Sequence, residues 1–200
     1  MNGFESLLAT VEERPLSRSL PTVLSVAGSI GATELASWAK LELMGYFASN
    51  PAMRDDVVVP IYRTVVGSWY DDYGRMLVLP QADLSFMDEL RLRQGVAELE
   101  GLATATGPLA VRARDHAALI GEALKVEVTT FEFEARSVAQ VLTNIKVQLL
   151  DQLCAQRAAI AALPASVTMA SSEIIQLKPG IYGISVELKA LWRRLFGGKD

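Results

Sequence analysis

The chain has little of the two side chains that build most metal centres and disulfides. Its 200 residues include one cysteine, Cys154, and one histidine, His116. A single cysteine excludes a disulfide within the chain and a cysteine-based zinc site, and a single histidine excludes a histidine-rich metal centre. This composition fits the reducing cytoplasm, and we expect no metal and no other cofactor.

The sequence also lacks excess positive charge and long apolar runs. It has 19 basic and 23 acidic residues, a net charge of −4 and a pI near 5.2, whereas proteins that coat nucleic acid often have a pI above about 9. The longest uncharged runs, Ser19 to Thr33 and Ala158 to Ser172, are shorter than the ~20 apolar residues of a membrane helix. Because no signal-peptide pattern begins the chain, we expect a soluble, cytoplasmic protein.

Familiar catalytic motifs are absent or incomplete. Gly180-x-x-Gly183 lacks the remaining residues of a phosphate-binding loop, and no Gly-x-Ser-x-Gly nucleophile elbow occurs. Glu187-Leu188-Lys189 has the letters of a metal-nuclease motif. We predict it in a tail helix rather than on a central strand, so a structural role is favoured over a catalytic one.

Isolated reactive residues are also better explained by structure. His116 follows Arg112 with three residues between them, which does not match the Arg–His spacing of toxin ribonucleases, so we interpret His116 as a surface or capping residue. Cys154 is interpreted as a core residue of a long helix. The acidic pair Asp71-Asp72 is interpreted as part of a turn, because Asp side chains accept hydrogen bonds from nearby backbone N–H groups.

Apolar periodicity predicts the elements of the fold. Half of the residues are apolar, which is enough for one core. Helical spacing predicts helices at 17–30, 34–47, 94–104 and 136–163. β-Branched and aromatic runs predict a β-hairpin at 57–80, with a turn at 71–74, and a further strand at 126–134. Segment 107–124 has no assignable pattern.

These elements predict a helix-dominated α+β domain with a small antiparallel sheet, made by the hairpin 57–80 and the strand 126–134. We expect the domain to cover residues 1–164. Small and polar residues at 165–173 are typical of a linker, and a C-terminal arm at 174–200 follows it, ending in a short amphipathic basic helix.

The first third of the chain carries a cluster of special residues: Trp38, Glu42, Gly45, Tyr46, Pro60, Tyr62 and Arg63. Glu42 lies one turn after Trp38 on a mostly apolar helix, where an unpaired carboxylate is costly. Arg63 is the nearest cation able to meet Glu42 after the chain turns back. We therefore predict a buried or half-buried salt bridge that holds the helix against the hairpin.

The spelling Trp38-x-x-x-Glu42-Leu43-x-Gly45-Tyr46, followed by Pro60-x-Tyr62-Arg63, resembles the AbiTii domain of bacteria. Further similar segments are 92–100 and 145–150, so the resemblance covers about residues 16–160. Met44 and Ile61 depart from the pattern, which has a polar and an acidic residue there. The resemblance implies a role in abortive infection or other phage defence.

The C-terminal arm is predicted to make contacts. Its extended half contains a Pro-Gly turn, and its helix has an apolar face opposite basic residues. The candidate interaction residues are Pro179, Gly180, Tyr182, Leu188, Leu191, Trp192, Leu195 and Phe196. Three destinations stay open: its own or a neighbouring subunit's domain, a separate protein, and an anionic membrane surface. We expect the arm to carry oligomerisation if the chain self-associates.

Together these patterns predict a bacterial antiphage defence component that acts through protein contacts and self-association. Its expected partners are further copies of itself, a defence protein encoded nearby, or both. Two alternatives stay open, a nuclease-like toxin and a membrane-perturbing effector. A polar constellation in a cleft would favour the enzyme, whereas an apolar arm that binds a second subunit would favour assembly.

Overall fold

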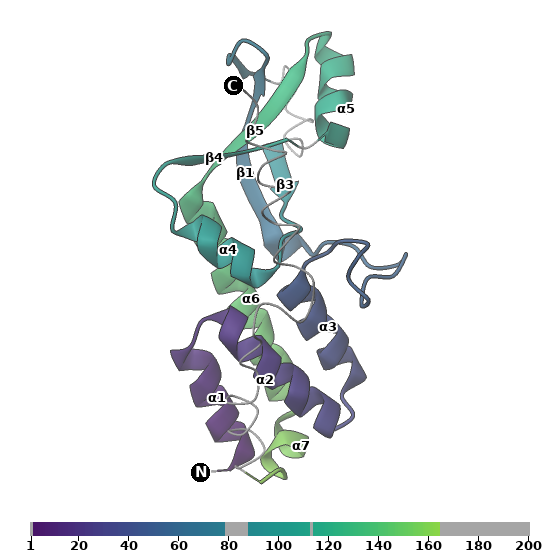
Figure 1. Cartoon of the computed structure of the whole chain (residues 1–200), viewed down its shortest axis with the longest axis vertical. Coiled ribbons are helices and arrows are strands. Elements are labelled where there is room, and N and C mark those ends of the chain that lie inside the picture. Colours follow the sequence, from purple (N-terminus) through teal and green to yellow (C-terminus); the bar gives the residue numbers. More distant parts are fainter. Residues whose placement is uncertain (1, 79–87, 113, 165–200) are drawn as a thin grey trace, which may run out of the picture.

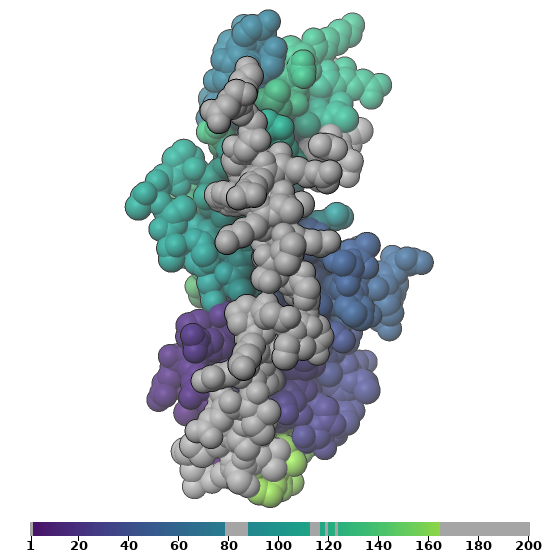
Figure 2. Space-filling view, in the orientation of Figure 1, coloured from purple at the N-terminus to yellow at the C-terminus, as the bar shows by residue number. Residues whose placement is uncertain are grey.

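The computed structural model of the chain describes residues 2–78, 88–112 and 114–164. These residues form an elongated body with a bundle of helices at one end and a small sheet at the other (Figure 1). The space-filling view in the same orientation shows the same elongated outline (Figure 2). The predicted linker 165–173 and arm 174–200 lie outside the described residues.

The described residues confirm the predicted helix-dominated α+β class with a small antiparallel sheet. The helices are α1 (Gly3–Glu13), α2 (Leu16–Ser29), α3 (Thr33–Met44), α4 (Val96–Ala103), α5 (Arg114–Leu124), α6 (Ala135–Ala155) and α7 (Arg157–Ala161), with a 3-10 turn η1 (Ile61–Arg63). The strands are β1 (Thr64–Asp71), β2 (Met76–Leu77), β3 (Glu89–Arg91), β4 (Pro108–Val111) and β5 (Val128–Glu134).

Hydrogen bonds at helix termini stabilise the helical end of the molecule. α1, which the sequence reasoning did not assign, begins with a capping box in which the Asn2 side chain accepts the Glu5 N–H and the Glu5 carboxylate accepts the Asn2 N–H. α2 receives a carboxylate from another helix, because the Ser17 N–H donates to Glu100 Oε1 at 3.1 Å. That contact ties α4 to the start of α2, where a negative charge is favourable.

The sheet has the strand order β2-β1-β5-β4, and β3 also pairs with β1. All pairs are antiparallel. The predicted hairpin is present but shorter than expected, because β1 begins at Thr64 and not at residue 57. Pro60 and η1 occupy the preceding residues, and a proline cannot donate a hydrogen bond to a strand ladder.

The hairpin turn confirms the structural interpretation of Asp71. Its carboxylate accepts hydrogen bonds from the N–H groups of Tyr73 at 3.0 Å and Arg75 at 2.8 Å, and from Arg75 Nε at 2.7 Å. Burial by itself raises the pKa of the Asp71 carboxyl, but these contacts outweigh it and hold the pKa below its usual value. Gly74 has a φ of +73°, which a glycine adopts easily.

The two faces of the sheet have different environments. Val65, Trp69, Phe131 and Phe133 point into the core, where each is at most 3% exposed. The Trp69 and Phe131 ring centroids lie 4.9 Å apart. Gly67 leaves space for this packing, since a Cβ there would lie 2.7 Å from the Phe131 ring. The residues between these inward positions therefore form the opposite face.

α6 is shorter than the predicted helix 136–163. It ends at Ala155, Gln156 takes φ −101° and ψ 10°, and the short α7 follows. The apolar stripe of α6 is buried through Leu149 and Leu153. Cys154, predicted as a core residue, is exposed instead, because it lies one residue beyond the buried Leu153 and points to a different side of the helix.

Segment 107–124, which had no assignment, contains β4 and α5. β4 pairs with β5, placing Leu109 opposite Phe133 and Val111 opposite Phe131 on the inner face. α5 packs beside β5 and buries Ile120. Four residues of strand with only two inward apolar positions make a pattern too short to separate from a loop.

Candidate functional site

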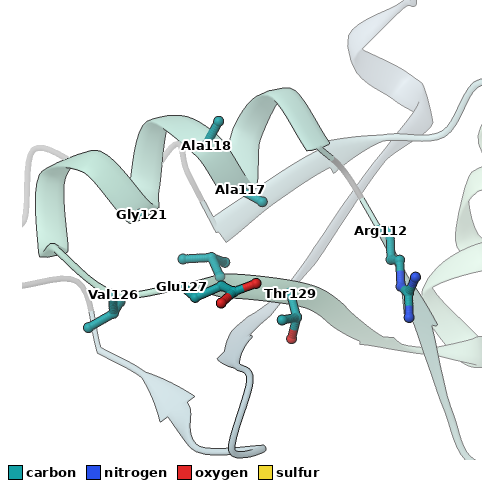
Figure 3. A pocket seen from close by; sticks show the side chains of 8 residues that line it. Arg112, Ala117, Ala118, Gly121, Val126, Glu127 and Thr129 are labelled. Carbon is teal, nitrogen blue, oxygen red and sulfur yellow. The ribbon is translucent and has the colours of Figure 1, made fainter.

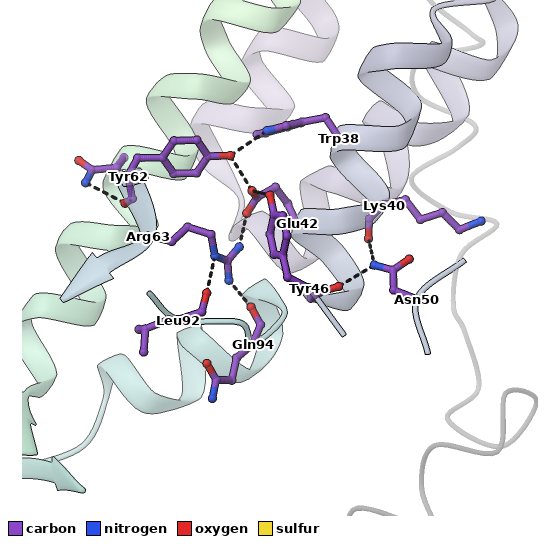
Figure 4. A network of polar contacts seen from close by, with 11 residues as sticks. Trp38, Lys40, Glu42, Tyr46, Asn50, Tyr62, Arg63, Leu92 and Gln94 are labelled. Carbon is purple, nitrogen blue, oxygen red and sulfur yellow. Dashed lines mark hydrogen bonds and ion pairs between the residues drawn. The ribbon is translucent and has the colours of Figure 1, made fainter. Parts of the chain in front are cut away.

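Five of the predicted residues, Trp38, Glu42, Tyr46, Tyr62 and Arg63, meet in a polar network (Figure 4). With Gly45 and Pro60, which adjoin them in sequence, they are defined here as the joint. Glu42 of α3 and Arg63 of η1 form an ion pair, as the sequence predicted, and neither side chain has exposed surface. Arg63 also donates from Nε to the Leu92 carbonyl at 2.8 Å and from its other terminal nitrogen to the Gln94 carbonyl. One guanidinium thus holds α3 and the segment before α4.

Two tyrosine hydroxyls complete the environment of the Glu42 carboxylate. The hydroxyl groups of Tyr46 and Tyr62 both donate to Glu42 Oε1, each at 2.7 Å. Trp38 Nε1 donates to the Tyr62 hydroxyl at 2.9 Å. The Glu42 carboxylate therefore has three donors, with Tyr46 and Tyr62 on Oε1 and Arg63 on Oε2. These hydrogen bonds satisfy a charge that burial would otherwise penalise.

Both tyrosines are held in the protonated form. Burial, and next the negative charge of Glu42, raise the pKa of Tyr46 and of Tyr62 well above the ordinary value of 10.0. The Arg63 guanidinium lies over the Tyr46 ring, 5.0 Å from its centroid, so the cation also contacts an aromatic face. Because both hydroxyls stay neutral, the charges of Glu42 and Arg63 are the charges of the buried centre, and they cancel.

Two glycines allow the end of α3 and the segment before α4 to approach each other closely. Gly45 has a φ of +85°, and a Cβ there would lie 2.6 Å from the Arg93 carbonyl oxygen. A Cβ at Gly95 would lie 2.4 Å from the Leu43 carbonyl oxygen. The Tyr46 N–H donates to the Arg93 carbonyl at 2.8 Å, which fixes the same contact. Gly45 therefore serves as the end of α3 and as part of an interface.

Two asparagines that the sequence reasoning missed support the joint. Asn50 Nδ2 donates to the carbonyl of Gly45 at 2.7 Å and to that of Lys40 at 3.2 Å, so it satisfies carbonyls at the end of α3. Asn144 of α6 donates to the Tyr62 carbonyl at 3.2 Å. Neither has a sequence signal beyond its residue type, because each bonds to backbone rather than to another motif side chain.

Pro60 lies at the start of the 3-10 turn, and the two residues that depart from the family pattern, Met44 and Ile61, lie at the surface. Pro60 precedes η1, and its carbonyl accepts the Arg63 N–H at 3.1 Å. Met44 is 42% exposed and Ile61 is 72% exposed. Because both departing side chains reach solvent while the joint is buried, the substitutions leave its hydrogen bonds intact.

The other candidate catalytic and interaction residues fall on parts of the chain whose side chains the structure does not describe. His116 lies in α5, and its side chain is outside the described part of the chain, as are Glu187, Lys189 and the eight candidate interaction residues of the arm. Within residues 2–78, 88–112 and 114–164, no group of three or more His, Cys, Asp or Glu side chains lies together so that it could hold a metal ion. None of the helices in those ranges is long and apolar enough to cross a membrane.

A separate pocket of about 340 Å³ lies between α5 and the start of β5 (Figure 3). Its lining is mainly small or apolar, and the charged side chains are Arg112 and Glu127. The remaining lining residues are Ala117, Ala118, Gly121, Val126, Val128 and Thr129. None of the joint residues lines it, so the pocket and the joint are independent features.

The fold consists of a small antiparallel sheet and a helical body. The buried Glu42–Arg63 ion pair connects segments of this fold and is its best-defined polar site. The chain belongs to the AbiTii family, whose model matches residues 7–172. This match includes every residue of the joint. Membership connects the chain with abortive infection, a form of phage defence. No curated protein and no solved structure matches the chain.

Proposed function

We propose that the protein is a component of bacterial antiphage defence of the abortive-infection type and that it acts through protein contacts and self-association. The observation that carries this proposal is the family match over residues 7–172. The joint lies inside the matched segment and joins α3, η1 and the segment before α4. It gives the domain a rigid body on which binding surfaces can be placed.

The hydrogen bonding of the joint favours a structural role over catalysis. Glu42 accepts from Tyr46, Tyr62 and Arg63, and the carboxylate is fully buried. A general base must reach the proton of a substrate, and a buried carboxylate with three protein donors does not offer that access. The joint therefore supports the proposal by holding surfaces in place.

Exposed apolar side chains near the joint support the protein-contact part of the proposal. Val58 and Ile61 are each 72% exposed, and Val147 of α6 is 49% exposed. Met44, the last residue of α3, and Phe47, three residues beyond it, are also exposed. η1 packs against α6, so several of these side chains come from adjoining elements. We take Val58 and Ile61, the most exposed of these side chains, as the candidate contact residues, because protein-binding sites are built from exposed apolar surface.

A test in cells addresses the defence role. The gene is expressed with its chromosomal neighbours in a bacterial host, and phage plating is measured against a host that lacks the gene. We expect fewer plaques and early death of infected cells. A Val58→Asp and Ile61→Asp double variant should lose protection, while Tyr73→Ser, which changes a 77% exposed residue on the distant hairpin, should keep it. Equal plaque numbers with and without the gene would refute the proposal.

A test in solution addresses self-association. Light scattering on the purified full chain should give a mass that is a multiple of 21.7 kDa. The Val58→Asp and Ile61→Asp double variant should lower that mass if these residues form the contact. A monomer at all concentrations would contradict self-association, and protection that persists in the monomer would assign the function to contacts with a different protein.

A further inference from the structure

The face of the sheet opposite the core is open. Strand alternation and the observed register place Val66 beside Glu89, Tyr70 beside Met76, and Ser68 beside Glu132 on this side. Val66 is 64% exposed and Met76 is 57% exposed, whereas Val65 and Trp69 on the inner side are buried. Ser68, Tyr70, Thr130 and Glu132, between these ends, are half-buried. The open face is defined here by the outward positions of the strands: Thr64, Val66, Ser68, Tyr70, Met76, Glu89, Arg91, Pro108, Ala110, Thr130, Glu132 and Glu134.

The side chains of the open face are complementary to a segment that carries both apolar and basic residues. Its centre has small side chains, because Glu132 lies between Ser68 and Ala110 in the register, and the apolar Val66 and Met76 lie toward its ends. The basic residue on this face, Arg91, donates to the Val59 carbonyl at 3.0 Å. Among the described residues, no basic side chain forms an ion pair with Glu89 or Glu132. An apolar surface with unpaired carboxylates is complementary to a ligand that carries apolar and basic groups on one segment.

The C-terminal arm has this complementary composition. Residues 178–200 contain five basic and two acidic residues, a net charge of +3, which leaves −7 on the rest of the chain. At helical spacing, Leu188, Leu191, Trp192 and Leu195 fall on one face, and Lys189 and Arg193 lie beside it. Burying a tryptophan removes about 200 Å² of mostly apolar surface from water, which makes Trp192 the strongest anchor in the arm.

The arm can reach the open face of its own chain. The described residues end at Pro164, beyond α7, at the end of the molecule opposite the sheet (Figure 1). α6, with 21 residues, spans about 32 Å of that separation and β5 up to about 24 Å more. Residues 165–186 can extend over about 70 Å. A tether that reaches its own surface acts at a high effective concentration, which favours the intramolecular contact.

We infer that residues 174–200 fold back and dock on the open face of the same chain, with Trp192 on the small side chains of the centre and Lys189 or Arg193 beside Glu132. This inference rests on the proposed role of the protein in making contacts, and it assigns the arm a surface of its own domain. The arm then covers apolar side chains that would otherwise favour aggregation.

Zero-length carbodiimide cross-linking of the full chain tests the inference. The reagent joins a carboxylate to an amine only when the two are in contact. An equal mixture of ¹⁴N-labelled and ¹⁵N-labelled chains shows whether the linked arm belongs to the same chain or to a second copy. We expect peptides that join Glu132 or Glu89 to Lys189, each with a single isotope. Mixed-isotope peptides would place the arm on a second copy, and links confined to acids outside the open face would place it elsewhere; either result overturns the inference.

Two variants separate docking from random encounter. Trp192→Ala keeps both reactive groups of the Glu132–Lys189 link but removes the apolar anchor, so the link should be lost; a link that persists would overturn docking. Glu132→Gln should remove the link, and Glu12→Gln, a change in α1, should keep it. The phage-plating test is read separately, so a failed defence role and a failed docking site give different results.

Discussion

The Arg63 guanidinium pairs with the Glu42 carboxylate across 21 positions of sequence, in a place where neither side chain reaches solvent. The same guanidinium donates to carbonyl groups 29 and 31 positions further along. One side chain thus connects three segments of backbone. The stability of the domain should therefore depend strongly on this pair.

Removal of one partner should be severely destabilising. Arg63→Met leaves the Glu42 carboxylate buried without its cation, which typically costs about 3–5 kcal/mol of unfolding free energy. Urea denaturation followed by circular dichroism measures the loss. The matched control is Arg54→Met, which removes the pair with Asp56 at 3.3 Å; both of those side chains are more than 70% exposed. That loss should stay below about 1 kcal/mol, and equal losses at the two sites would contradict a special role for the joint.

The double variant Glu42→Met with Arg63→Met extends this prediction. Removing both charges avoids leaving either one unpaired, so the double variant should be less destabilised than the sum of the two single variants. The same denaturation experiment gives the coupling energy. Additive losses would show that the two side chains act independently.

Tyr62→Phe should loosen the joint without adding bulk. The change removes the hydroxyl that accepts from Trp38 Nε1 and donates to Glu42, which leaves one donor and one acceptor position unsatisfied. Such a loss costs about 1–3 kcal/mol. Denaturation monitored by tryptophan fluorescence reports both stability and the surroundings of Trp38. Tyr73→Phe, at a residue 77% exposed, is the control and should be close to neutral; a similar loss in both variants would refute the prediction.

The raised pKa values of Tyr46 and Tyr62 predict loss of stability in alkali. Above the ordinary value of 10.0, the unfolded chain loses these protons while the folded chain keeps them. The folded state then binds more protons, so stability is complete below that pH and falls as pH rises above it. Melting temperatures between about pH 8 and pH 11 should show this slope. Tyr46→Phe or Tyr62→Phe should flatten it, and an unchanged slope in both would exclude these groups as its cause.

Glycine substitutions should separate close backbone contacts from ordinary helix positions. Gly45→Ala and Gly95→Ala both place a Cβ against a carbonyl oxygen, at 2.6 and 2.4 Å, and should lower the melting temperature strongly. Gly28 lies in α2, and a methyl group added there would have nothing within 4 Å. Gly28→Ala should therefore be stabilising, by about 0.5–1 kcal/mol. A shift of the melting temperature in the same direction in all three variants would contradict this distinction.

The purified chain should not cleave DNA or RNA in the presence of Mg²⁺ or Mn²⁺. Its nuclease-like triplet, Glu187-Leu188-Lys189, is predicted in a tail helix rather than at a strand end, where metal-dependent nucleases usually place their carboxylates. Gel assays with and without EDTA test this expectation. Cleavage that EDTA abolishes, and that Glu187→Ala or Lys189→Ala also abolishes, would make the nuclease-like toxin the better assignment.

Local sequence patterns predicted much of the architecture. The buried side of α6 follows from apolar residues at helical spacing, and the turn at Asp71 follows from its ability to accept local N–H groups. The Glu42–Arg63 pair was also predicted, because a lone carboxylate on an apolar helix needs a cation. In each case, the interacting side chains can be recognised from residue type and spacing alone.

The tertiary structure decided the features whose partners carry no side-chain signal. The carbonyls of Leu92 and Gln94 that receive Arg63, and the carbonyl of Gly45 that receives Asn50, could belong to any residue type. The break of α6 at Gln156 and the exposure of Cys154 depend on packing at the helix end. A sequence determines which groups must find a partner, but backbone acceptors are identical along the chain, so only the folded geometry selects among them.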